Sequence, residues 1–379
     1  MTAALSRAGR IVVKVGSALL VERTSGLRSG WLNSLVADIA AVMQAGKDVI
    51  IVSSGAIALG EQALDLQSKP KQLSTAQAAA CIGQISLLNA YQEAFNQYDK
   101  KIGQLLLTVS DLDGRRTYLN ARDALQTLIR NGIVPVINEN DATATQEIRV
   151  GDNDRLAARV AQMIDADLLI LLSDIDGVYT ANPKTHADAQ HIPIIESITP
   201  EVYAAAEGPQ LDSMGSGGMR TKLDAGRILS DCGCDMIVMD GRGDAPLARL
   251  SSGERHSFFK TKRSDKIDAR HAWIAGQLSI QGSIVVDDGA HQALLRGKSL
   301  LAAGITHLTG TFSRGDTVYI KTPSGQDIAR GLVNYDMTEL ARIKGLKNDD
   351  IAAALGYTRS QTVIHRDNMV LSRQPDTAT

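Results

Sequence analysis

Continuous apolar runs alternate with amphipathic stretches along roughly the first 240 residues. The apolar runs predict strands over residues 10–15, 48–54, 102–109, 133–141, 166–174 and 234–240. Helical periodicity lies between them, over residues 31–46, 74–98, 115–132, 152–164 and within 215–233, and a run of small residues spans 55–64. Several strand runs are apolar throughout, as expected when both faces of a sheet are covered. We therefore predict an α/β fold, a three-layer sandwich with a mainly parallel central sheet.

The pattern changes near residue 250. Residues 253–273 carry six Lys or Arg and three acidic residues, with little periodicity. Short strand-like pieces separated by turn residues follow, which predicts a small, mostly β domain. The expected organisation is an α/β domain over 8–255, a basic linker over 256–276, a small β domain over 277–360 and a C-terminal tail over 361–379.

Composition narrows the class of protein only modestly. Hydrophobic residues make up 44% and charged residues 22% of the 379 residues, as in a globular protein, and the net charge of −2 points to no nucleic-acid or membrane partner. The sequence contains no apolar run of membrane-spanning length and no signal-peptide pattern. The three cysteines and seven histidines form no recognisable metal set, so a reducing cytoplasm is the expected setting.

Small, polar and charged residues stand at the carboxyl ends of four of the predicted strands. Lys14 and Gly16 end the first strand, and Ser54 and Gly55 follow the second. The other two such stretches are "NENDA" at 138–142 and Ser173-Asp174. Because ligands of parallel sheets bind beyond the carboxyl ends of the strands, we expect a site there.

A late glycine cluster, "GSGGMRTK" at 215–222, precedes a helix. It matches neither the phosphate loop, which needs Gly-Lys-Ser/Thr after a spaced glycine, nor the dinucleotide fingerprint, because Arg220 stands where the last glycine belongs. Taken alone, such a cluster favours a flexible loop before an ordinary helix.

Taken together, these blocks resemble the amino-acid kinase family and, within it, the glutamate 5-kinases. The residues that carry the resemblance are "VVKVGSALL", "IVSSGAIALG", "NARDALQTLIRNGIVPVINENDA", "VGDNDRLAA", "LLLSDIDGVYT", "GSGGMRTK", "FSRGDTVYI" and "HRDNMV". Their order and spacing cover nearly the whole chain, and the small C-terminal domain resembles a PUA domain. Ser173 and Ser216 stand where the family often has threonine, and both keep the hydroxyl.

The resemblance implies transfer of a phosphoryl group from ATP to the side-chain carboxylate of L-glutamate, the first step of proline biosynthesis. It implies that Lys14, Asp154 and Lys222 are catalytic, with Asp154 orienting both lysines. Its ATP contacts are Lys14, Gly16, Ser173, Asp174, Ser216, Gly217, Gly218, Met219, Arg220, Thr221 and Lys222. Mg²⁺ would arrive with the nucleotide, so we name no metal ligand.

The same resemblance implies that glutamate contacts Ser54, Gly55, Asp141 and Asn153, with Asp141 binding the α-ammonium group. It further implies inhibition by proline and assembly into a homo-oligomer, a dimer or a tetramer. The chemistry is consistent with this, because a carboxylate acceptor with an unperturbed pKa of about 4.3 needs no general base. Catalysis then depends on positioning and on neutralising charge.

Each of these residues also has a plainer interpretation. Lys14 could be a solvated lysine at a strand end, "NEND" a polar turn, and Ser173-Asp174 a helix cap. Asp152 or Asn153 could be the N-cap of the helix that follows, and Asp154 would suit its first turn.

Two rival functions remain at this stage. PUA domains occur in RNA-modifying proteins, but residues 277–357 hold eight basic and eight acidic residues, and phosphate binding needs a cationic face. The linker cations Arg255, Lys260, Lys262, Arg263, Lys266 and Arg270 fit a solvated connector, so no RNA partner is expected. A kinase of the same fold acting on another acid or phosphate is the second rival.

Overall fold

A computed structural model describes residues 3–22, 25–66, 72–113, 115–143, 152–183, 185–199, 202–203, 218–230, 232–261, 274, 280, 282–357 and 360–372. The chain divides into two compact units, residues 1–266 and residues 267–379. We refer to them as the larger and the smaller unit. Among the described helices, none is both long and apolar enough to cross a membrane.

An eight-stranded sheet forms the centre of the larger unit. In spatial order its strands are β10 (Ile194–Ile195), β12 (His256–Phe259), β11 (Asp235–Asp240), β7 (Leu168–Ser173), β1 (Arg10–Val15), β4 (Asp48–Ser53), β6 (Val134–Glu139) and β5 (Ile102–Leu107). Every neighbouring pair is parallel except β11 with β12. The predicted mainly parallel sheet is therefore confirmed.

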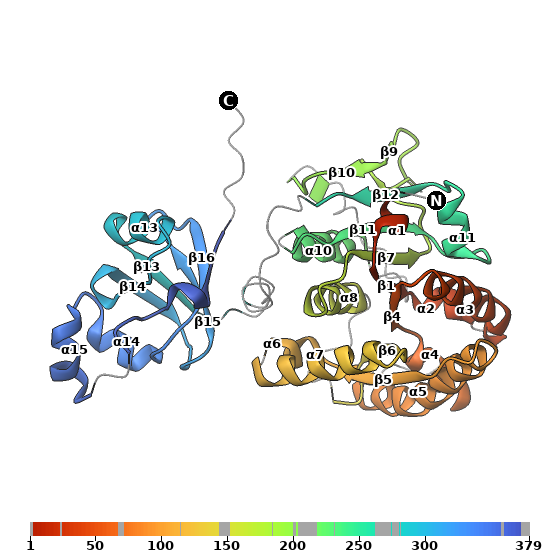
Figure 1. Cartoon of the computed structure of the whole chain (residues 1–379), viewed down its shortest axis with the longest axis horizontal. Coiled ribbons are helices and arrows are strands. Elements are labelled where there is room, and N and C mark those ends of the chain that lie inside the picture. Colours follow the sequence, from red (N-terminus) through yellow and green to blue (C-terminus); the bar gives the residue numbers. More distant parts are fainter. Residues whose placement is uncertain are drawn as a thin grey trace. The chain divides into compact units, whose positions relative to one another are not determined.

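Helices cover both faces of this sheet. Figure 1 shows α8 (Asp152–Met163) and α10 (Met219–Ser230) on one side, and α2 (Ser17–Leu20), α3 (Ser29–Gln44) and α11 (Pro246–Ser251) on the other. The side chains of successive residues in a strand point to opposite faces of the sheet. Met236 lies against Gly226 of α10, whereas the next residue, Ile237, joins the core cluster shared with α3 and α11. Burial on both faces explains why β1 and β7 are apolar throughout.

The larger unit has further helices, two of them long, and several short strands. They are α1 (Ala3–Arg7), β2 (Val21–Glu22), β3 (Gly26–Leu27), α4 (Ala56–Ala63), α5 (Leu73–Asn96), α6 (Val109–Asp113), α7 (Arg115–Arg130), β8 (Val178–Tyr179) and β9 (His191–Ile192).

The small-residue run at 55–64 forms α4, which packs closely on α5. A Cβ at Gly60 would lie 1.8 Å from the carbonyl oxygen of Ala79, and one at Gly83 would lie 1.8 Å from that of Ala56. Both distances are shorter than any real contact, so the two helix backbones touch where the glycines face each other. This contact requires the small residues that the sequence places there.

Strand β12 lies in the stretch that we expected to be a linker. His256–Phe259 pairs antiparallel with β11 and parallel with β10, and its alternate residues are buried. A strand of four residues is too short to show a clear alternation of hydrophobic and polar positions, and the charged residues on both sides of it obscure that alternation further. Strand β11, the last of the strands that the sequence predicts for this domain, is therefore an internal strand of the sheet.

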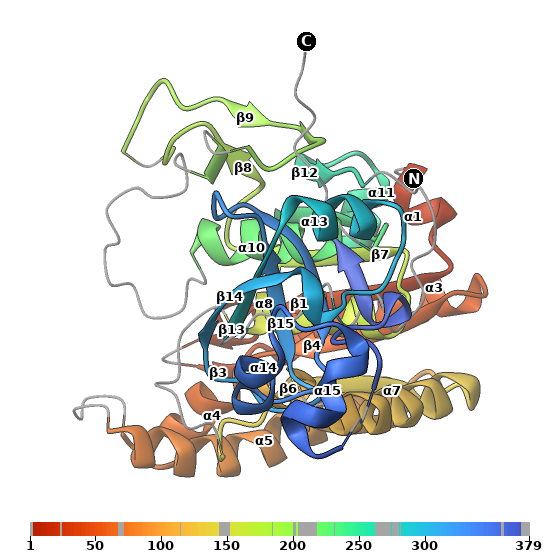
Figure 2. The ribbon, with the colours of Figure 1, turned by 90° about the vertical axis from the view of Figure 1, so that its left-hand side faces the viewer.

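The smaller unit is built on a five-stranded sheet, coloured cyan to blue in Figure 2. Its strand order is β14 (Ile305–Gly310), β13 (Gly282–Val286), β15 (Thr317–Lys321), β16 (Asp327–Leu332) and β17 (Met369–Leu371). Its helices are α13 (Asp288–Leu295), η1 (Ala302–Gly304), α14 (Met337–Ile343), α15 (Asn348–Leu355) and η2 (Arg366–Asn368). The mostly β character predicted for this part is confirmed.

Part of the expected C-terminal tail belongs to this fold. Strand β17 pairs with β16, and Val363 and Ile364 are buried in the core of the smaller unit. The strand has only three residues, so it carries no readable sequence pattern.

Candidate active site

The carboxyl ends of β1, β4, β6 and β7 meet at one edge of the central sheet. Val15 at the end of β1 is paired with Ser53 of β4 and with Leu172 of β7. The carboxyl ends of parallel strands lie at the same edge of a sheet. Lys14, Ser54 and Ser173 are therefore brought together there, although they are far apart in sequence.

Three charged side chains form a buried cluster above this edge. The ammonium group of Lys14, on β1, lies 2.7 Å from Oδ1 of Asp154, and that of Lys222, on α10, lies 3.1 Å from Oδ2 of the same carboxylate. Asp154 is fully buried, and the lysines are 7% and 4% exposed. Buried charges are rare unless they are paired, so the interpretation of Lys14 as a solvated lysine is wrong.

Local structure explains why Asp154 faces inward. Helix α8 begins at Asp152, so Asn153 and Asp154 lie in its first turn, where the helix dipole favours an acid. The Thr221 hydroxyl, in the first turn of α10, donates to Asp154 Oδ2 at 2.8 Å. The starts of two helices therefore meet at one carboxylate.

Burial and charge compete within this cluster. Burial alone would raise the pKa of Asp154, but Lys14 and Lys222, with hydrogen bonds from Lys14 and Thr221, hold that pKa well below its usual range. Burial lowers the pKa of Lys14, Asp154 opposes that effect, and Lys222 adds to the lowering. Both lysines pair with the single Asp154 carboxylate, and the charge of Asp174 also acts on Lys14, so the cluster can accept an anionic ligand.

A chain of side-chain amides lies beside the cluster, at the ends of β4 and β6. Asn153 Nδ2 donates to Ser54 Oγ at 2.7 Å and to Asn138 Oδ1 at 3.2 Å. Asn138 Nδ2 in turn donates to Gln84 Oε1 at 2.8 Å. The Asn153 amide is therefore used across the site and not as a helix cap.

Both ends of this amide chain are open. Asn153 Oδ1, an acceptor, and Gln84 Nε2, a donor, are buried without a hydrogen-bond partner among the described residues. Buried polar atoms are nearly always hydrogen-bonded, so the two atoms indicate a polar ligand with a donor and an acceptor of its own.

The other predicted site residues lie around these two groups of side chains. A Cβ at Gly16 would lie 3.9 Å from Lys14 Nζ. Gly55 has a φ of 103°, a left-handed conformation that favours glycine, at the start of α4. Asp141 is half-buried in the turn after β6.

Strand β7 ends at Ser173, and the Ser173 hydroxyl donates to the carboxylate of the next residue, Asp174, at 3.2 Å. A bend and then β8 follow, so the helix-cap interpretation of this pair is wrong. Gly218 to Thr221 lead into and begin α10, whereas Ser216 and Gly217 lie outside the described residues.

Sequence reasoning missed Asn138 and Gln84 as members of the site. Asn138 stands in the "NENDA" stretch but was not distinguished from its neighbours. Gln84 lies in the middle of α5, where a glutamine is an ordinary helix residue. Only the packing of α5 against the sheet reveals it.

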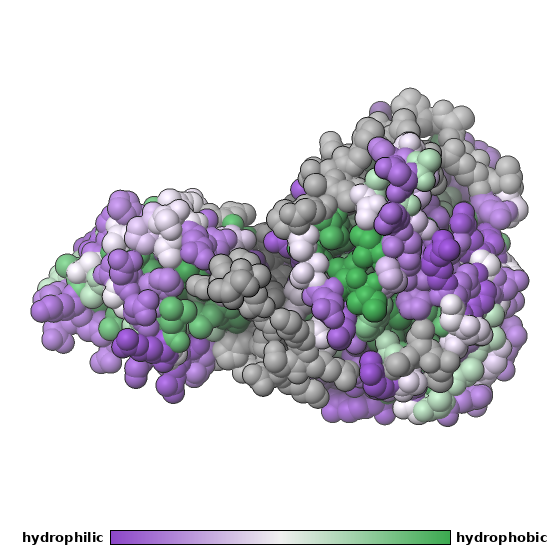
Figure 3. Space-filling view, turned by 90° about the horizontal axis from the view of Figure 1, so that it is seen from above, coloured by the Kyte–Doolittle hydropathy of each residue, from purple (hydrophilic) through white to green (hydrophobic). Residues whose placement is uncertain are grey.

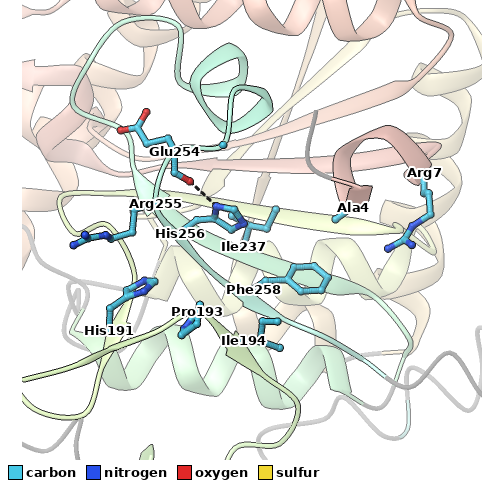
Figure 4. Close-up of a pocket in the computed structure, with 11 residues that line it drawn as sticks. Ala4, Arg7, His191, Pro193, Ile194, Ile237, Glu254, Arg255, His256 and Phe258 are labelled. Carbon is cyan, nitrogen blue, oxygen red and sulfur yellow. Dashed lines mark hydrogen bonds between the residues drawn. The ribbon is translucent and has the colours of Figure 1, made fainter.

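A cavity of about 450 Å³ lies elsewhere on the larger unit. Figure 4 shows Arg7 on one side, His191 and Arg255 on the other, and Ile237 and Phe258 between them. Ile237 faces away from α10, so the cavity opens on the opposite face of the sheet from Lys222. Figure 3, which looks onto the end of the sheet with β10 and β12, shows hydrophobic side chains gathered on this unit.

Comparison with known proteins identifies the family. The sequence profile of the amino acid kinase family matches residues 9–240. The chain belongs to the amino acid kinase family. In this amino acid kinase, a second profile, that of the PUA domain, matches residues 282–355.

Relatives of this amino acid kinase match it over almost its full length. The glutamate 5-kinase of Rhizobium rhizogenes is 52% identical, over 97% of the chain and 94% of the relative. Glutamate 5-kinase 1 of Rhizobium meliloti is 51% identical, over 97% of the chain and 93% of the relative. Among solved structures, a carbamate kinase from Giardia lamblia bound to AMP-PNP covers 68% of the chain and is itself covered completely, with 13% identity and a TM-score of 0.50. At that identity the match supports the fold alone.

Proposed function

We propose that the protein transfers the γ-phosphoryl group of ATP to the side-chain carboxylate of L-glutamate in the cytoplasm, as the first step of proline biosynthesis. The observation that carries the proposal is the buried cluster of Lys14, Asp154 and Lys222 beside an open amide chain. The cluster suits phosphates, and the amide chain suits a small polar acid. The relatives named glutamate 5-kinase support this choice of acid.

The chemistry needs cations more than bases. A carboxylate oxygen of glutamate forms a bond to the γ-phosphorus, the bond from that phosphorus to the bridging oxygen breaks, and ADP leaves with the electron pair. No proton has to move. Lys14 and Lys222 neutralise the charge on the phosphoryl oxygens, and Asp154 holds both lysines in place.

On the nucleotide side, we assign binding to Gly16, Ser173, Asp174 and residues 216–222. The start of α10 offers backbone N–H groups and the positive end of a helix dipole to phosphate. Bound Mg²⁺ would neutralise phosphate charge. Among the described residues no three His, Cys, Asp or Glu side chains are grouped as a metal site would require, and we assign no protein ligand to Mg²⁺.

On the acceptor side, we assign glutamate to Ser54, Gly55, Asp141 and Asn153. Asn153 Oδ1 can accept a hydrogen bond from the α-ammonium group, for which Asp141 supplies the opposite charge. The Gln84 amide can donate to a carboxylate oxygen. Both open ends of the amide chain would then be satisfied by one zwitterion.

A panel of acceptors tests the proposal. The protein is incubated with ATP, Mg²⁺ and either glutamate, N-acetylglutamate, aspartate, carbamate or UMP, and hydroxylamine traps any acyl phosphate, while ADP release reports the others. We expect hydroxamate with glutamate and at most about 1% of that rate with any other acceptor, because a missing hydrogen bond in a site built for it costs 10²-fold or more. Faster turnover of another acceptor would contradict the proposal.

Replacing Asp141 should affect the binding of glutamate but not the binding of ATP. Asp141→Ala should raise the KM for glutamate about 10- to 100-fold, the scale of losing a charge-assisted hydrogen bond. The KM for ATP should change less than about twofold, because Asp141 would touch only the acceptor. Steady-state kinetics with each substrate varied in turn measure both. Asp141→Asn keeps the shape of the turn, so a normal KM in that variant would mean that the charge plays no part.

Proline should compete with glutamate. It keeps the α-carboxylate and a secondary ammonium group, which are the groups that Asp141 and the amide chain would bind. We expect proline to raise the apparent KM for glutamate without lowering kcat, and D-proline to be weaker. Initial rates measured while the concentrations of glutamate and proline are both varied show whether inhibition is competitive. A fall in kcat at saturating glutamate would place the proline site elsewhere.

The larger unit should work alone. Every assigned residue precedes Lys266, and the two hydrophobic cores share no residue. A chain of residues 1–266 retains β12, so we expect it to fold and to keep kcat within about threefold, since contacts between domains of one chain are often modest. Full-length and truncated proteins should bind RNA equally weakly at physiological salt. Inactive truncated protein, or salt-sensitive RNA binding that truncation abolishes, would contradict this account.

A further inference from the structure

Helices α8 and α10 share a second ion pair beside the buried cluster. Arg155 of α8 binds the Asp224 carboxylate of α10 through two guanidinium nitrogens, with Nε 3.0 Å from Oδ2. Arg155 directly follows Asp154, and Asp224 lies two positions after Lys222. Each helix therefore contributes one acidic and one basic residue. In one ion pair the acid comes from α8, and in the other it comes from α10.

A tyrosine completes the arrangement. The Tyr203 hydroxyl donates a hydrogen bond to Asp224 Oδ1, so both carboxylate oxygens of Asp224 are engaged. The guanidinium carbons of Arg220 and Arg227 each lie 5.7 Å from the centre of the Tyr203 ring. These contacts hold Tyr203 on α10.

The arrangement is partly shielded from solvent. The side chains of Arg155 and Asp224 are 32% and 16% exposed. A guanidinium–carboxylate pair at this depth, with its geometry restrained by a tyrosine, is stronger than a free surface pair. It therefore can fix how α10 lies against α8.

We propose that Arg155, Asp224 and Tyr203, called here the α8–α10 clamp, are positioning residues for phosphoryl transfer, an inference that rests on the function proposed above. The clamp would hold α10 so that the Lys222 ammonium stays 3.1 Å from Asp154 and points at the transferring phosphoryl group. Lysine is a flexible side chain, and a displacement of about 1 Å at a reacting centre can cost 10²-fold in rate. The clamp acts through Lys222 and touches neither substrate.

Asp224→Asn tests the clamp, because asparagine keeps the shape and can still accept from Tyr203. We expect kcat to fall about tenfold and the KM for ATP to rise up to about fivefold, because the clamp acts on the lysine that meets the γ-phosphate, whereas the KM for glutamate should stay within about twofold. Asp224→Glu, which keeps the charge, should restore at least a third of kcat. In a Lys222→Ala background, Asp224→Asn should change kcat less than about twofold, because the lysine that it positions is gone.

A matched control is available in the same unit. Arg10 and Asp48 form an ion pair of 3.0 Å with 28% and 41% exposure, at the amino-terminal ends of β1 and β4. Asp48→Asn should leave kcat unchanged. The midpoints of thermal unfolding of all variants are compared, so that a general loss of stability is recognised. A kcat within twofold of the wild type in Asp224→Asn, or losses that multiply fully with those of Lys222→Ala, would overturn the inference.

Nucleotide affinity separates this inference from the proposed function. Calorimetry with Mg·AMP-PNP and with ADP needs no acceptor. Asp224→Asn should weaken AMP-PNP about fivefold and ADP less than twofold, since Lys222 would meet only the γ-phosphate. Equal changes for the two nucleotides would contradict the clamp, whichever acid proves to be the acceptor. Absence of glutamyl hydroxamate with the wild-type protein would contradict the proposed function alone.

Discussion

Lys222→Ala should lower kcat by about 10²- to 10³-fold, the scale of removing one preorganised charge from a transition state. Lys222 is 4% exposed and lies 3.1 Å from Asp154, so its ammonium group is held in place before any substrate arrives. The KM for glutamate should change less than about threefold, because the lysine would face the phosphoryl group and not the acceptor's α-substituents. Steady-state rates of ADP release at saturating ATP measure the effect.

Two further variants make this result specific. Lys222→Met keeps the aliphatic volume and should lose as much activity as the alanine variant, which excludes a packing defect. Lys260→Ala removes another lysine that pairs with a carboxylate, Glu196, but at 59% exposure, and should leave kcat unchanged. A kcat near normal in either Lys222 variant would remove Lys222 from the mechanism.

Asp154→Asn should produce the largest loss of stability. The substitution leaves two buried ammonium groups with a neutral partner, and breaking a buried ion pair on one side costs about 3–5 kcal/mol. Activity should fall at least as far as with Lys222→Ala. Asp48→Asn, at the more exposed pair with Arg10, should cost about 1 kcal/mol or less. Denaturant unfolding at pH 7 measures the free energy of unfolding of the full-length wild type, Asp154→Asn and Asp48→Asn.

The pH dependence of that loss has a definite sign. The folded-state pKa of Asp154 is depressed, so its contribution is fully present above about pH 4 and is lost only as pH falls through the folded value. The folded-state pKa of Lys14 is lowered, so the unfolded chain binds more protons there and stability rises with pH. Removing Asp154 lowers the Lys14 pKa further. The deficit of Asp154→Asn should therefore shrink as pH rises through the folded-state pKa of Lys14 in the variant and level off above that of the wild type; a deficit that grows with pH would contradict the charge balance described for the cluster.

Much of the fold could be predicted because its strands are continuous apolar runs. Strands covered on both faces, such as β1 and β7, differ clearly from the amphipathic helices between them. The parallel topology then brings Lys14, Ser54 and Ser173 to one edge. Short strands that carry no period escaped prediction, as β12 and β17 show.

The site was predictable only where residues lie at strand ends or in recognisable blocks. Gln84 contributes from the middle of α5, and Arg155 meets Asp224 across 69 positions of the chain. Neither contact has a local signal, because both arise from how α5 packs on the sheet and how α8 packs on α10. The family resemblance implied which charged residues act on the phosphates and that Asp154 orients the two lysines, but not how α10 is held against α8.

The most direct test of phosphoryl transfer to the glutamate side chain is an isotope measurement. Glutamate labelled with ¹⁸O in its side-chain carboxylate is incubated with the protein, ATP, Mg²⁺ and hydroxylamine, and the hydroxamate and inorganic phosphate are analysed by mass spectrometry. If a carboxylate oxygen attacks the γ-phosphorus, hydroxylamine then displaces phosphate at the acyl carbon, and each hydroxamate formed releases one phosphate with a single ¹⁸O. Hydroxamate without labelled phosphate, or ADP release without hydroxamate, would contradict the account.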